Sequence, residues 1–488
     1  MSVATKNTAS HHHLGINVPN HWQVVPLENI LSGIVGGGTP SRSKAPYWEG
    51  SIPWLTVKDM RTRRPSDAMD HISEKAVLES ATNIIPPDTL IIATRVGLGK
   101  IIRVPFEAAI NQDLKALITK PEVDKSYLEY WFLCIADYLG SIGSGTTVKG
   151  IRLEQLRSLP VPLAPLDDQK RIVAEIEKQF SRLDEAVTSL KRAKANLKRY
   201  KAAVLKAAVE GKLTEEWRKQ HPDIEPASEL LKRILAERRR KWEEAELAKM
   251  RAKGKEPKDD KWKEKFSDPE GSNNTDDSQL PNAWCWCSTD QLFWSVTSGS
   301  RGWAKYYADD GPIFLRIGNL DHDSIELDLM NIQRVKPPLG VEGTRTRVQA
   351  GEILISITAD VGMVAIISDN FEETYINQHI ALARPAGKLN RSFLAWFLAS
   401  KPGQKQLRSL QRGATKVGLG LNDIRAINVP LPPLIEQNNI VSEIDSRSSL
   451  LLTLENELEL NLVRAARLRQ SILKKAFSGE LIDQSLIS

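Results

Sequence analysis

Two stretches of the chain place apolar side chains at helical spacing over about 40 residues each. Between Ile172 and Ala208, and again between Ile440 and Ala476, apolar residues recur at intervals of three, four or seven. This spacing gathers them on one face of a helix, as in a coiled coil. We therefore expect two long helices that pack along a seam formed by Ile172, Ile176, Leu183, Leu190, Leu197, Ile440, Ile444, Leu451, Leu458 and Ile472.

The charges beside this seam favour an antiparallel pair. If the helices ran parallel, the cations between Lys198 and Lys206 would face those between Arg467 and Lys474. Antiparallel packing removes this repulsion and brings residues 191–194, which are basic, near the acidic residues of 455–459. Exposed pairs of this kind stabilise a helix pair only slightly, so they indicate direction more than stability.

Ahead of each predicted helix, the pattern changes to that of short strands and helices. Residues 89–94 and 352–357 are β-branched runs bounded by Pro or Gly, which is typical of buried strands. Residues 127–139 and 393–400 fit short helices. We therefore expect an α+β domain in each half of the chain.

The two halves repeat one another. Residues 145–151 match residues 413–419 at an offset of 268, and the same offset carries the Pro-rich segment 161–166 onto 429–434 and Gln169 onto Gln437. Upstream, the tripeptide 110–112 (Ile-Asn-Gln) returns at 376–378, and Asn-x-Trp at 20–22 returns at 282–284. Each half is therefore a variable domain followed by a constant helix, in a pseudo-twofold internal repeat.

These patterns divide the chain into six segments. The boundaries that we expect are a tail at 1–19, a first domain at 20–165, a spacer helix at 166–214, a charged insert and linker at 215–280, a second domain at 281–432 and a second spacer helix at 433–488. Within the insert, a helix is predicted from Ala227 to about Lys253. A solvated helix with a linker is the favoured interpretation of this charge run, and partner docking is the alternative.

Composition excludes several classes of protein. With 488 residues, 41% of them hydrophobic and 26% charged, the chain is long enough for several folded domains. It contains no apolar run near the roughly 20 residues of a membrane helix and no signal segment, so a cytoplasmic location is expected. The net charge of +6 is compatible with nucleic acid, yet residues 20–165 hold 16 Lys and Arg against 15 Asp and Glu. Charge alone therefore does not identify the function.

Motifs for chemistry are missing from the sequence. Three cysteines cannot form a disulfide framework, and Cys285 with Cys287 lacks a second ligand pair, so no metal site is expected. No Asn/Asp-Pro-Pro-aromatic methyltransferase motif and no phosphate-binding loop occur, and residues 97–100 (Gly-Leu-Gly-Lys) are followed by Ile101, which indicates a turn. A self-sufficient methyltransferase or nuclease is therefore disfavoured, and no catalytic residue is predicted.

Two variable domains, each introduced by Asn-x-Trp and closed by a Pro-rich segment, a glutamine and a long helix, resemble the specificity subunits of Type I restriction-modification enzymes. The most specific segments are 431–441 and 163–173, although Ala164 and Asp168 stand where Pro and Glu are commoner. The resemblance covers nearly the whole chain. A coiled-coil scaffold or a stand-alone DNA-binding protein is the alternative, but a scaffold does not explain two equally placed domains.

The resemblance implies a function and a set of partners. It implies a bipartite target in double-stranded DNA, with each half read by one domain and with the antiparallel helices fixing the separation. It also implies two modification subunits, which bring S-adenosylmethionine and methylate an adenine in each half-site, and restriction subunits, which bring ATP- and Mg-dependent translocation and cleavage. This chain itself would hold no cofactor.

Reading DNA bases and phosphates requires forked, basic or amide side chains. Each loop cation taken alone is most simply a solvated surface charge, but as a set they are expected to include several DNA contacts. The candidates are Arg42, Lys44, Lys58, Arg61, Arg63, Arg64, Arg95 and Lys149 in the first domain, and Arg301, Lys305, Arg316, Arg345, Arg347, Arg412 and Lys416 in the second.

Two repeated loop motifs have a structural interpretation beside the functional one. The Gly-rich loops, with Thr146, Thr147, Gly150, Thr415 and Gly418, are expected to form tight turns, with a backbone contact to phosphate as the alternative. The repeated Asn-Gln pairs at 111–112 and 377–378 favour a side-chain hydrogen bond to the backbone over base reading.

Overall fold

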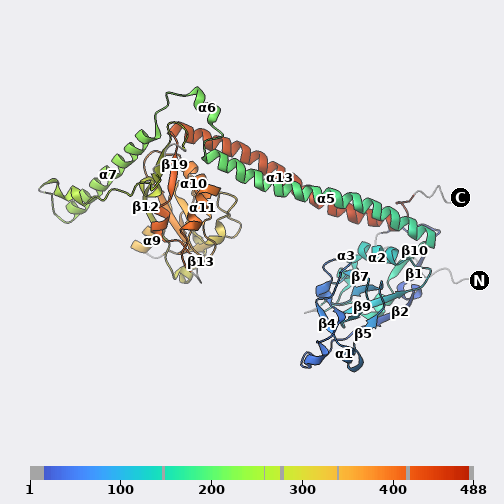
Figure 1. The fold of residues 1–488 in the computed structure, drawn as a ribbon. Coiled ribbons are helices and arrows are strands. Elements are labelled where there is room, and N and C mark those ends of the chain that lie inside the picture. The colour runs from blue at the N-terminus through green and yellow to red at the C-terminus, as the bar shows by residue number, and fades with distance from the viewer. Residues whose placement is uncertain are drawn as a thin grey trace, which may run out of the picture. The chain divides into compact units, whose positions relative to one another are not determined.

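The computed structural model describes residues 16–145, 149–257, 259–274, 280–337, 340–413 and 418–482 (Figure 1). The chain divides into two compact units, one formed by Met1–Arg192 with Leu458–Ser488 and the other by Ala193–Glu457. Each unit holds one α+β domain and parts of two long helices, α5 (Leu166–Val209) and α13 (Leu434–Phe477). The predicted fold class is confirmed.

The described residues of the first unit's domain form three sheets. A two-stranded antiparallel sheet joins β1 (Gln23–Pro26) near the start of the domain to β10 (Pro160–Leu163) at its end. An antiparallel sheet has the order β2–β9–β6–β7, with β2 (Leu31–Gly36), β9 (Leu114–Thr119), β6 (Leu90–Ala93) and β7 (Ile101–Arg103). A mixed sheet has the order β4–β3–β8–β5, with β4 (Asp70–Ile72), β3 (Ile52–Leu55), β8 (Ala108–Ile110) and β5 (Asn83–Ile85).

The second unit repeats this topology. Strand β11 (Cys285–Ser288) pairs with β19 (Asn428–Leu431), as β1 pairs with β10. The antiparallel sheet has the order β12–β18–β15–β16, with β12 (Phe293–Ser298), β18 (Ile380–Pro385), β15 (Ile353–Ser356) and β16 (Val364–Ile366). The mixed sheet has the order β14–β13–β17, with β14 (Gln333–Val335), β13 (Tyr307–Leu315) and β17 (Thr374–Ile376). An isolated antiparallel bridge between Arg347 and Tyr375 takes the place of β5.

Strands β6 and β15, which the apolar runs predicted, lie between two cores. Leu90 and Ile92 belong to the core that includes helix α2, whereas Ile91 and Ala93 belong to the core shared with the mixed sheet. Successive side chains point to opposite faces of a strand, so burial on both faces requires an uninterrupted apolar run. This explains why these segments lack the apolar-polar alternation of a half-exposed strand.

Short helices complete each domain. The first unit has α1 (Glu74–Glu79), α2 (Lys125–Cys134), α3 (Ala136–Ile142) and α4 (Leu153–Arg157). The second has α8 (Thr289–Leu292), α9 (Val341–Thr346), α10 (Arg391–Ala399), α11 (Lys401–Ser409) and α12 (Leu421–Arg425). The single helix predicted at 127–139 is wrong in one respect, because Ile135, with φ −98° and ψ 13°, separates α2 from α3.

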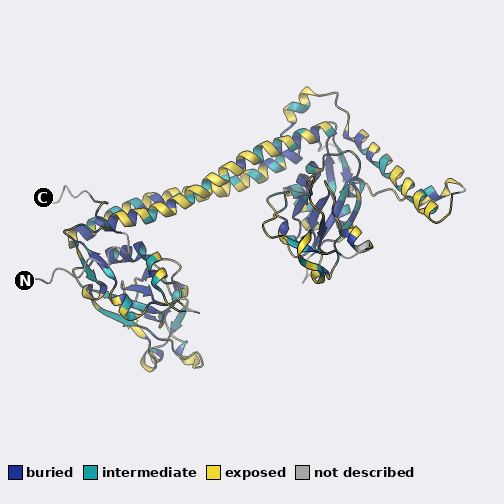
Figure 2. Cartoon of the chain, turned by 180° about the vertical axis from the view of Figure 1, so that it is seen from behind, coloured by how far each residue is buried: buried dark blue, intermediate teal, exposed yellow. Residues whose placement is uncertain are grey.

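The long helices pack antiparallel within each unit, as predicted. In the first unit, Ile172 and Ile176 near the start of α5 share a core with Ile472 and Ala476 near the end of α13. In the second unit, the end of α5 shares a core with Ile440 and Ile444 at the start of α13. Figure 2 shows that buried residues gather where the helices meet each domain, while Leu190, Leu197 and Leu458 of the seam are only half-buried.

The repeated glutamines attach the start of each long helix to its domain. Buried Gln169 donates to the carbonyl of Ala164 at 2.8 Å, and its oxygen accepts the backbone N–H of Asp124 at 2.8 Å. Gln437 makes the same two bonds, to the carbonyl of Pro432 and from the N–H of Asn390, at 2.8 Å each. Asp124 and Asn390 are the N-caps of α2 and α10, so one amide fixes the junction between two helices in both units.

The described residues of the charged insert are folded. They contain α6 (Glu215–Gln220), α7 (Ala227–Ala252) and a 3₁₀ helix, η5 (Asp260–Lys265). The helix predicted from Ala227 is confirmed. Its first turns contribute Ala227, Leu230 and Ile234 to the core of the second domain.

Candidate nucleic-acid interface

Three loops of the first domain meet at one end of its antiparallel sheet. They are the β6–β7 hairpin loop (94–100), the Asn-Gln turn after β8 (111–113) and the Gly-rich loop (143–150). The backbone N–H of Thr94 donates to the carbonyl of Asp113 at 2.8 Å, and that of Ile151 donates to the carbonyl of Thr94 at 2.8 Å. These bonds hold the three loops as one surface.

The second domain joins its equivalent loops through the same bonds. The N–H of Ile357 donates to the carbonyl of His379, and that of Leu419 donates to the carbonyl of Ile357, at 2.9 Å each. Within the Gly-rich loop, Arg412 and Gly418 exchange both backbone hydrogen bonds at 3.0 Å, as Ser144 and Gly150 do in the first domain. Thr146, Thr147, Thr415 and Lys416 lie outside the described residues.

A fourth loop, which follows β2 or β12, is placed by a glycine. A Cβ on Gly37 would lie 1.9 Å from the carbonyl oxygen of Ile110, and one on Gly299 would lie 2.1 Å from that of Asn377. No side chain fits against a backbone oxygen at this distance. The fourth loop therefore crosses the Asn-Gln turn in both domains, a relation that the sequence analysis missed, although the Gly-rich run at 36–38 hinted at it.

The repeated asparagines hold the turn between these loops. The side-chain oxygen of Asn111 accepts the N–H of Asp113 at 3.2 Å, and that of Asn377 accepts the N–H of His379 at 3.1 Å. The expected hydrogen bond from side chain to backbone is confirmed at both positions. The adjacent amide of Gln378 lies 2.8 Å from the ring of His379.

Both hairpin loops carry a residue that is not glycine in the left-handed region. Val96 has φ 46° and equivalent Ala359 has φ 64°. A β-branched residue is disfavoured in this region, and such outliers gather at functional sites. Val96 is also exposed, with 51% of its surface accessible, so the hairpin tip of the first domain presents an apolar side chain to solvent.

Three of the predicted cations of the first domain adjoin this surface. Arg95 lies in the hairpin loop, 54% exposed and 3.6 Å from Asp113, and exposed Lys149 lies in the Gly-rich loop. Lys58 lies on the 3₁₀ helix η4 (Val57–Asp59), and a Cβ on Gly97 of the hairpin would be 3.2 Å from the side chain of Val57. A further cation was missed: Lys115 donates to the carbonyl of Gln112 at 3.0 Å, and burial lowers its pKa.

Three other cations of the first domain lie on neighbouring loops. Arg42 is 3.0 Å from Asp70 and stacks 3.8 Å from the ring centre of Trp48. Lys44 donates to the hydroxyl of Tyr47 at 2.8 Å, and that bond raises the pKa of Lys44. Arg61 follows η4 and is exposed.

Arg63 and Arg64 are held by an acidic side chain of α2. Glu129 is 1% exposed and accepts two hydrogen bonds from the Arg64 guanidinium, at 2.7 and 2.6 Å. Arg63 and Arg103 each lie 3.5 Å from the same carboxylate. This cluster anchors residues 63–64 to α2, so its geometry accounts for both arginines through the packing of the domain.

The described cations of the second domain are placed as follows. Arg316 is half-buried and follows Leu315, whose carbonyl accepts the N–H of Asn377 at 3.1 Å. Arg345 donates to the hydroxyl of Ser300 at 2.5 Å. Arg412 is 80% exposed and 2.8 Å from Asp423. Arg347 is 3.8 Å from Glu373, Lys305 lies 4.9 Å from the ring centre of Tyr306, and Arg301 is exposed. Arg316, Arg345 and Arg412 thus adjoin the four loops.

Other kinds of site find little support among the described residues. No group of three or more His, Cys, Asp or Glu side chains is placed to hold a metal ion there. None of the helices described is long and apolar enough to cross a membrane. Cys134 is buried, and burial raises the pKa of its thiol to about 12, which disfavours a reactive thiolate.

Comparisons with known proteins agree with this geometry. The family model for the Type I restriction modification DNA specificity domain matches residues 19–199 and 343–463. The EcoBI specificity subunit of Escherichia coli is 26% identical over 477 residues, which cover 96% of this chain and 88% of that protein. A solved chain of the type I R-M system has a TM-score of 0.64 at 17% identity, covering 95% of this chain and 99% of its own length.

The HsdS subunit of Thermoanaerobacter tengcongensis has a TM-score of 0.50 at 18% identity and covers 95% of this chain and 98% of its own. At such identities, the solved structures support the fold, while the family model covers more than half of the sequence. The chain therefore belongs to the Type I restriction modification DNA specificity family, the non-catalytic DNA-recognition subunits of these enzymes.

Proposed function

We propose that this subunit reads a bipartite target in double-stranded DNA, with one half-site bound by the four-loop surface of each domain. The observation that carries the proposal is the repeated backbone frame. Equivalent hydrogen bonds join the loops in both domains, while the side chains on them differ: Arg95 of one hairpin corresponds to Thr358 of the other. A constant frame with variable side chains is what two domains need to read different sequences by the same geometry.

The cations on the loops divide into two groups in this proposal. Those at the four-loop surface are assigned to the groove or to the phosphates beside it: Lys58, Arg95, Lys149, Arg316, Arg345 and Arg412. Those on neighbouring loops are assigned to phosphates further along the duplex: Arg42, Lys44, Arg61, Arg301, Lys305 and Arg347. Lys416 stays a prediction, and Arg63 and Arg64 are assigned to the structural cluster around Glu129.

The catalytic steps are assigned to partner subunits. Two modification subunits would bind the paired helices and bring S-adenosylmethionine, and restriction subunits would bring the ATP- and Mg-dependent steps, all in the cytoplasm. Support comes from α13, where Leu450, Leu452 and Leu454 are exposed, whereas Tyr200 is the large hydrophobic residue exposed on the described part of α5. Exposed leucines on a helix favour a protein partner. The paired helices would also set the distance between half-sites.

The test is to map methylated adenines in DNA from cells that carry this subunit with its modification subunit. The expected result is one bipartite motif with an adenine methylated in each half. Exchanging residues 20–165 for those of a relative should change one half of the motif and leave the other half and the gap unchanged. A change in both halves, or methylation without sequence preference, would contradict the proposal.

A further inference from the structure

The charged insert of the second unit forms an arm with a defined shape. Helix α7 leaves the second domain, and the chain returns through η5 and residues 266–274 (Figure 1). Trp262 of η5 is buried and stacks on Trp242 of α7, with ring centres 6.0 Å apart, and Phe266 packs edge-on against Trp242 at 5.3 Å. This aromatic cluster packs the returning segment against α7, which a flexible linker would not require.

The root of the arm is fixed to the second domain. Arg238 donates to the carbonyl of Asp290, and burial lowers the pKa of Arg238. Gly387, with φ 64°, lets Ile234 approach so closely that a Cβ there would lie 2.9 Å from the Ile234 side chain. Because these contacts lie in the first half of α7, the second half projects from the domain (Figure 1).

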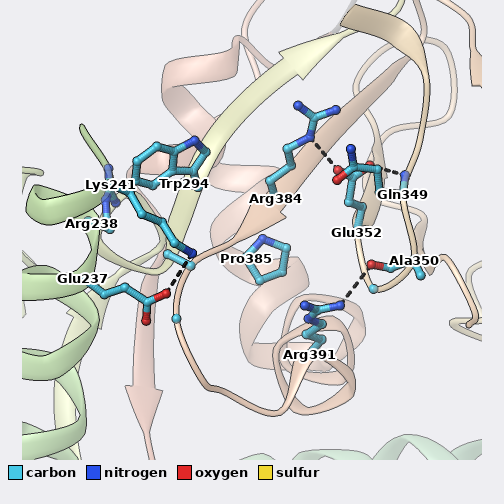
Figure 3. A pocket seen from close by; sticks show the side chains of 13 residues that line it. Glu237, Arg238, Lys241, Trp294, Gln349, Ala350, Glu352, Arg384, Pro385 and Arg391 are labelled. Carbon is cyan, nitrogen blue, oxygen red and sulfur yellow. Dashed lines mark hydrogen bonds and ion pairs between the residues drawn. The ribbon is translucent and has the colours of Figure 1, made fainter. Parts of the chain in front are cut away.

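A cavity of about 210 Å³ lies at this root, but its cations already have partners (Figure 3). Lys241 lies 2.7 Å from Glu237, and Arg391 donates to the carbonyl of Ala350 at 3.0 Å. Arg384 donates at 2.5 Å to Glu352, whose pKa is raised by burial. The cations that line this cavity are therefore already engaged within α7 or within the domain, so the cavity offers no free charge to a ligand.

The tip of the arm differs from the root, because it carries an excess of unpaired lysines. The arm, residues 228–266, holds 14 Lys and Arg against 9 Asp and Glu, a net charge of +5, and its tip, residues 253–266, contributes 6 Lys against 4 Asp and Glu. Along α7, Arg239 and Arg240 pair with Glu243 and Glu244 one turn away. Beyond it, four exposed lysines have no side-chain hydrogen bond or ion pair with any described residue: Lys253, Lys255, Lys261 and Lys265.

We propose that the tip of this arm binds the phosphate backbone of duplex DNA outside the recognition sequence. The inference rests on the proposed function, because it assumes that the second domain is bound to its half-site. Ammonium groups that are solvated and unpaired release condensed counterions from DNA, which strengthens binding without sequence preference. The part of α7 beyond Arg238, residues 239–252, is about 21 Å long, which corresponds to about 6 base pairs of B-DNA.

The test compares three variants of the full chain in complex with its modification subunits. The first, K253Q/K255Q/K261Q/K265Q, removes the unpaired cations. The second, E256Q/E264Q, makes the tip more positive by two charges. The third, E246Q/K249Q, removes a pair that is 2.7 Å apart and leaves the net charge unchanged. Binding is measured on duplexes that end at the recognition sequence and on duplexes extended by about 15 base pairs on both sides.

The lysine variant should bind the extended duplex about 10- to 100-fold more weakly at low salt, and its slope of log K against log [salt] should fall by about 2 to 4. On the short duplex it should match the wild type. The second variant should bind the extended duplex more tightly, and the third should match the wild type throughout. Methylation specificity should not change, because phosphate contacts carry no base information.

Unchanged affinity and salt slope of the lysine variant on the extended duplex would overturn the proposal. So would a loss of assembly with the modification subunits at unchanged DNA affinity, because the arm would then be a protein-docking element. The wild-type complex separates this result from failure of the proposed function: if it shows no preference for its target on either duplex, the recognition proposal fails, whatever the lysine variant does.

Discussion

The junctions between domain and long helix differ between the two units, although their backbones repeat. In the second unit, buried Glu436 accepts the indole N–H of Trp284 at 2.8 Å, the hydroxyl of Thr214 at 2.7 Å and the guanidinium of Arg218 at 2.8 Å. In the first unit, the position of Glu436 is taken by Asp168, which is 3.4 Å from Arg171 on its own helix. The buried indole N–H of Trp22 has no hydrogen-bond partner among the described residues.

The first unit has its buried charge elsewhere. Glu129 of α2 holds Arg64, while the equivalent position of α10 is Ala395, which has no charge to bury. A buried carboxylate is costly unless it is paired and hydrogen-bonded, so Glu129 and Glu436 each need a complete set of partners. The comparison teaches that the repeat preserves strand order and loop hydrogen bonds, while polar anchors can move from one element to another.

The largest effect is expected at the anchor of the second unit. Glu436→Ala removes the acceptor of the Trp284 indole and the carboxylate that pairs with Arg218 and Thr214, and it should lower the free energy of unfolding by about 3–5 kcal/mol. Denaturant unfolding followed by tryptophan fluorescence measures this change. The matched variant Asp168→Ala should lower the free energy of unfolding much less, because Asp168 pairs only with Arg171 among the described residues. Equal losses of stability in the two variants would contradict the proposed difference between the two junctions.

A second pair of variants should act alike in both units. Gly37→Ala and Gly299→Ala each place a Cβ within 2.1 Å of a backbone oxygen, which should cost about 2–3 kcal/mol through overpacking. Because the strain falls on the four-loop surface, binding to one half-site should weaken in each variant. Gly33→Ala is the control, since a Cβ there meets no atom within 4 Å. Unequal losses of stability in the two glycine variants would mean that the backbone of the four loops differs between the two domains.

The anchor of the first unit should have a smaller effect than that of the second. Glu129→Ala removes the partner of Arg64, but the Arg64 side chain is 46% exposed and water can replace the lost bonds, so we expect a loss of about 1–2 kcal/mol. A double-mutant cycle with Arg64→Ala measures the coupling. Ala395→Glu in the second unit should lower stability more than Glu129→Ala, because Ala395 is fully buried and Ile366 stands there at the position of Arg103, so the new carboxylate gains no such cation.

The smallest expected effect is a gain. Asp168→Glu gives the first unit the longer carboxylate of the second and allows it to accept the indole N–H of Trp22, which should add about 0.5–1 kcal/mol of stability. The thermal midpoint, measured together with that of an Asp168→Asn variant, tests this expectation. A loss of stability on lengthening the side chain would show that the two junctions differ in backbone position as well as in side-chain length.

The sequence by itself determined the elements that depend on local pattern. Period and spacing predicted the two long helices, their direction, the buried strands β6 and β15 and the helix that begins at Ala227. The internal repeat also indicated that Gln169 and Asn111 have counterparts in the same role. These properties were predictable for two reasons. The period of the apolar side chains indicates which face of an element is buried, and a residue that recurs in the repeat makes the same local hydrogen bonds in both copies.

Tertiary structure alone decided which groups meet across the chain. Glu129 binds an arginine 65 residues away, and Glu436 binds one 218 residues away, at separations that no local pattern encodes. The loops at residues 94, 113 and 151 meet through backbone hydrogen bonds. Almost any residue can form such bonds, so no sequence pattern predicts them. The availability of a cation for DNA depends on its neighbours in space, and for this reason the arm's lysines and the arginines at 63 and 64 look alike in sequence and differ in the fold.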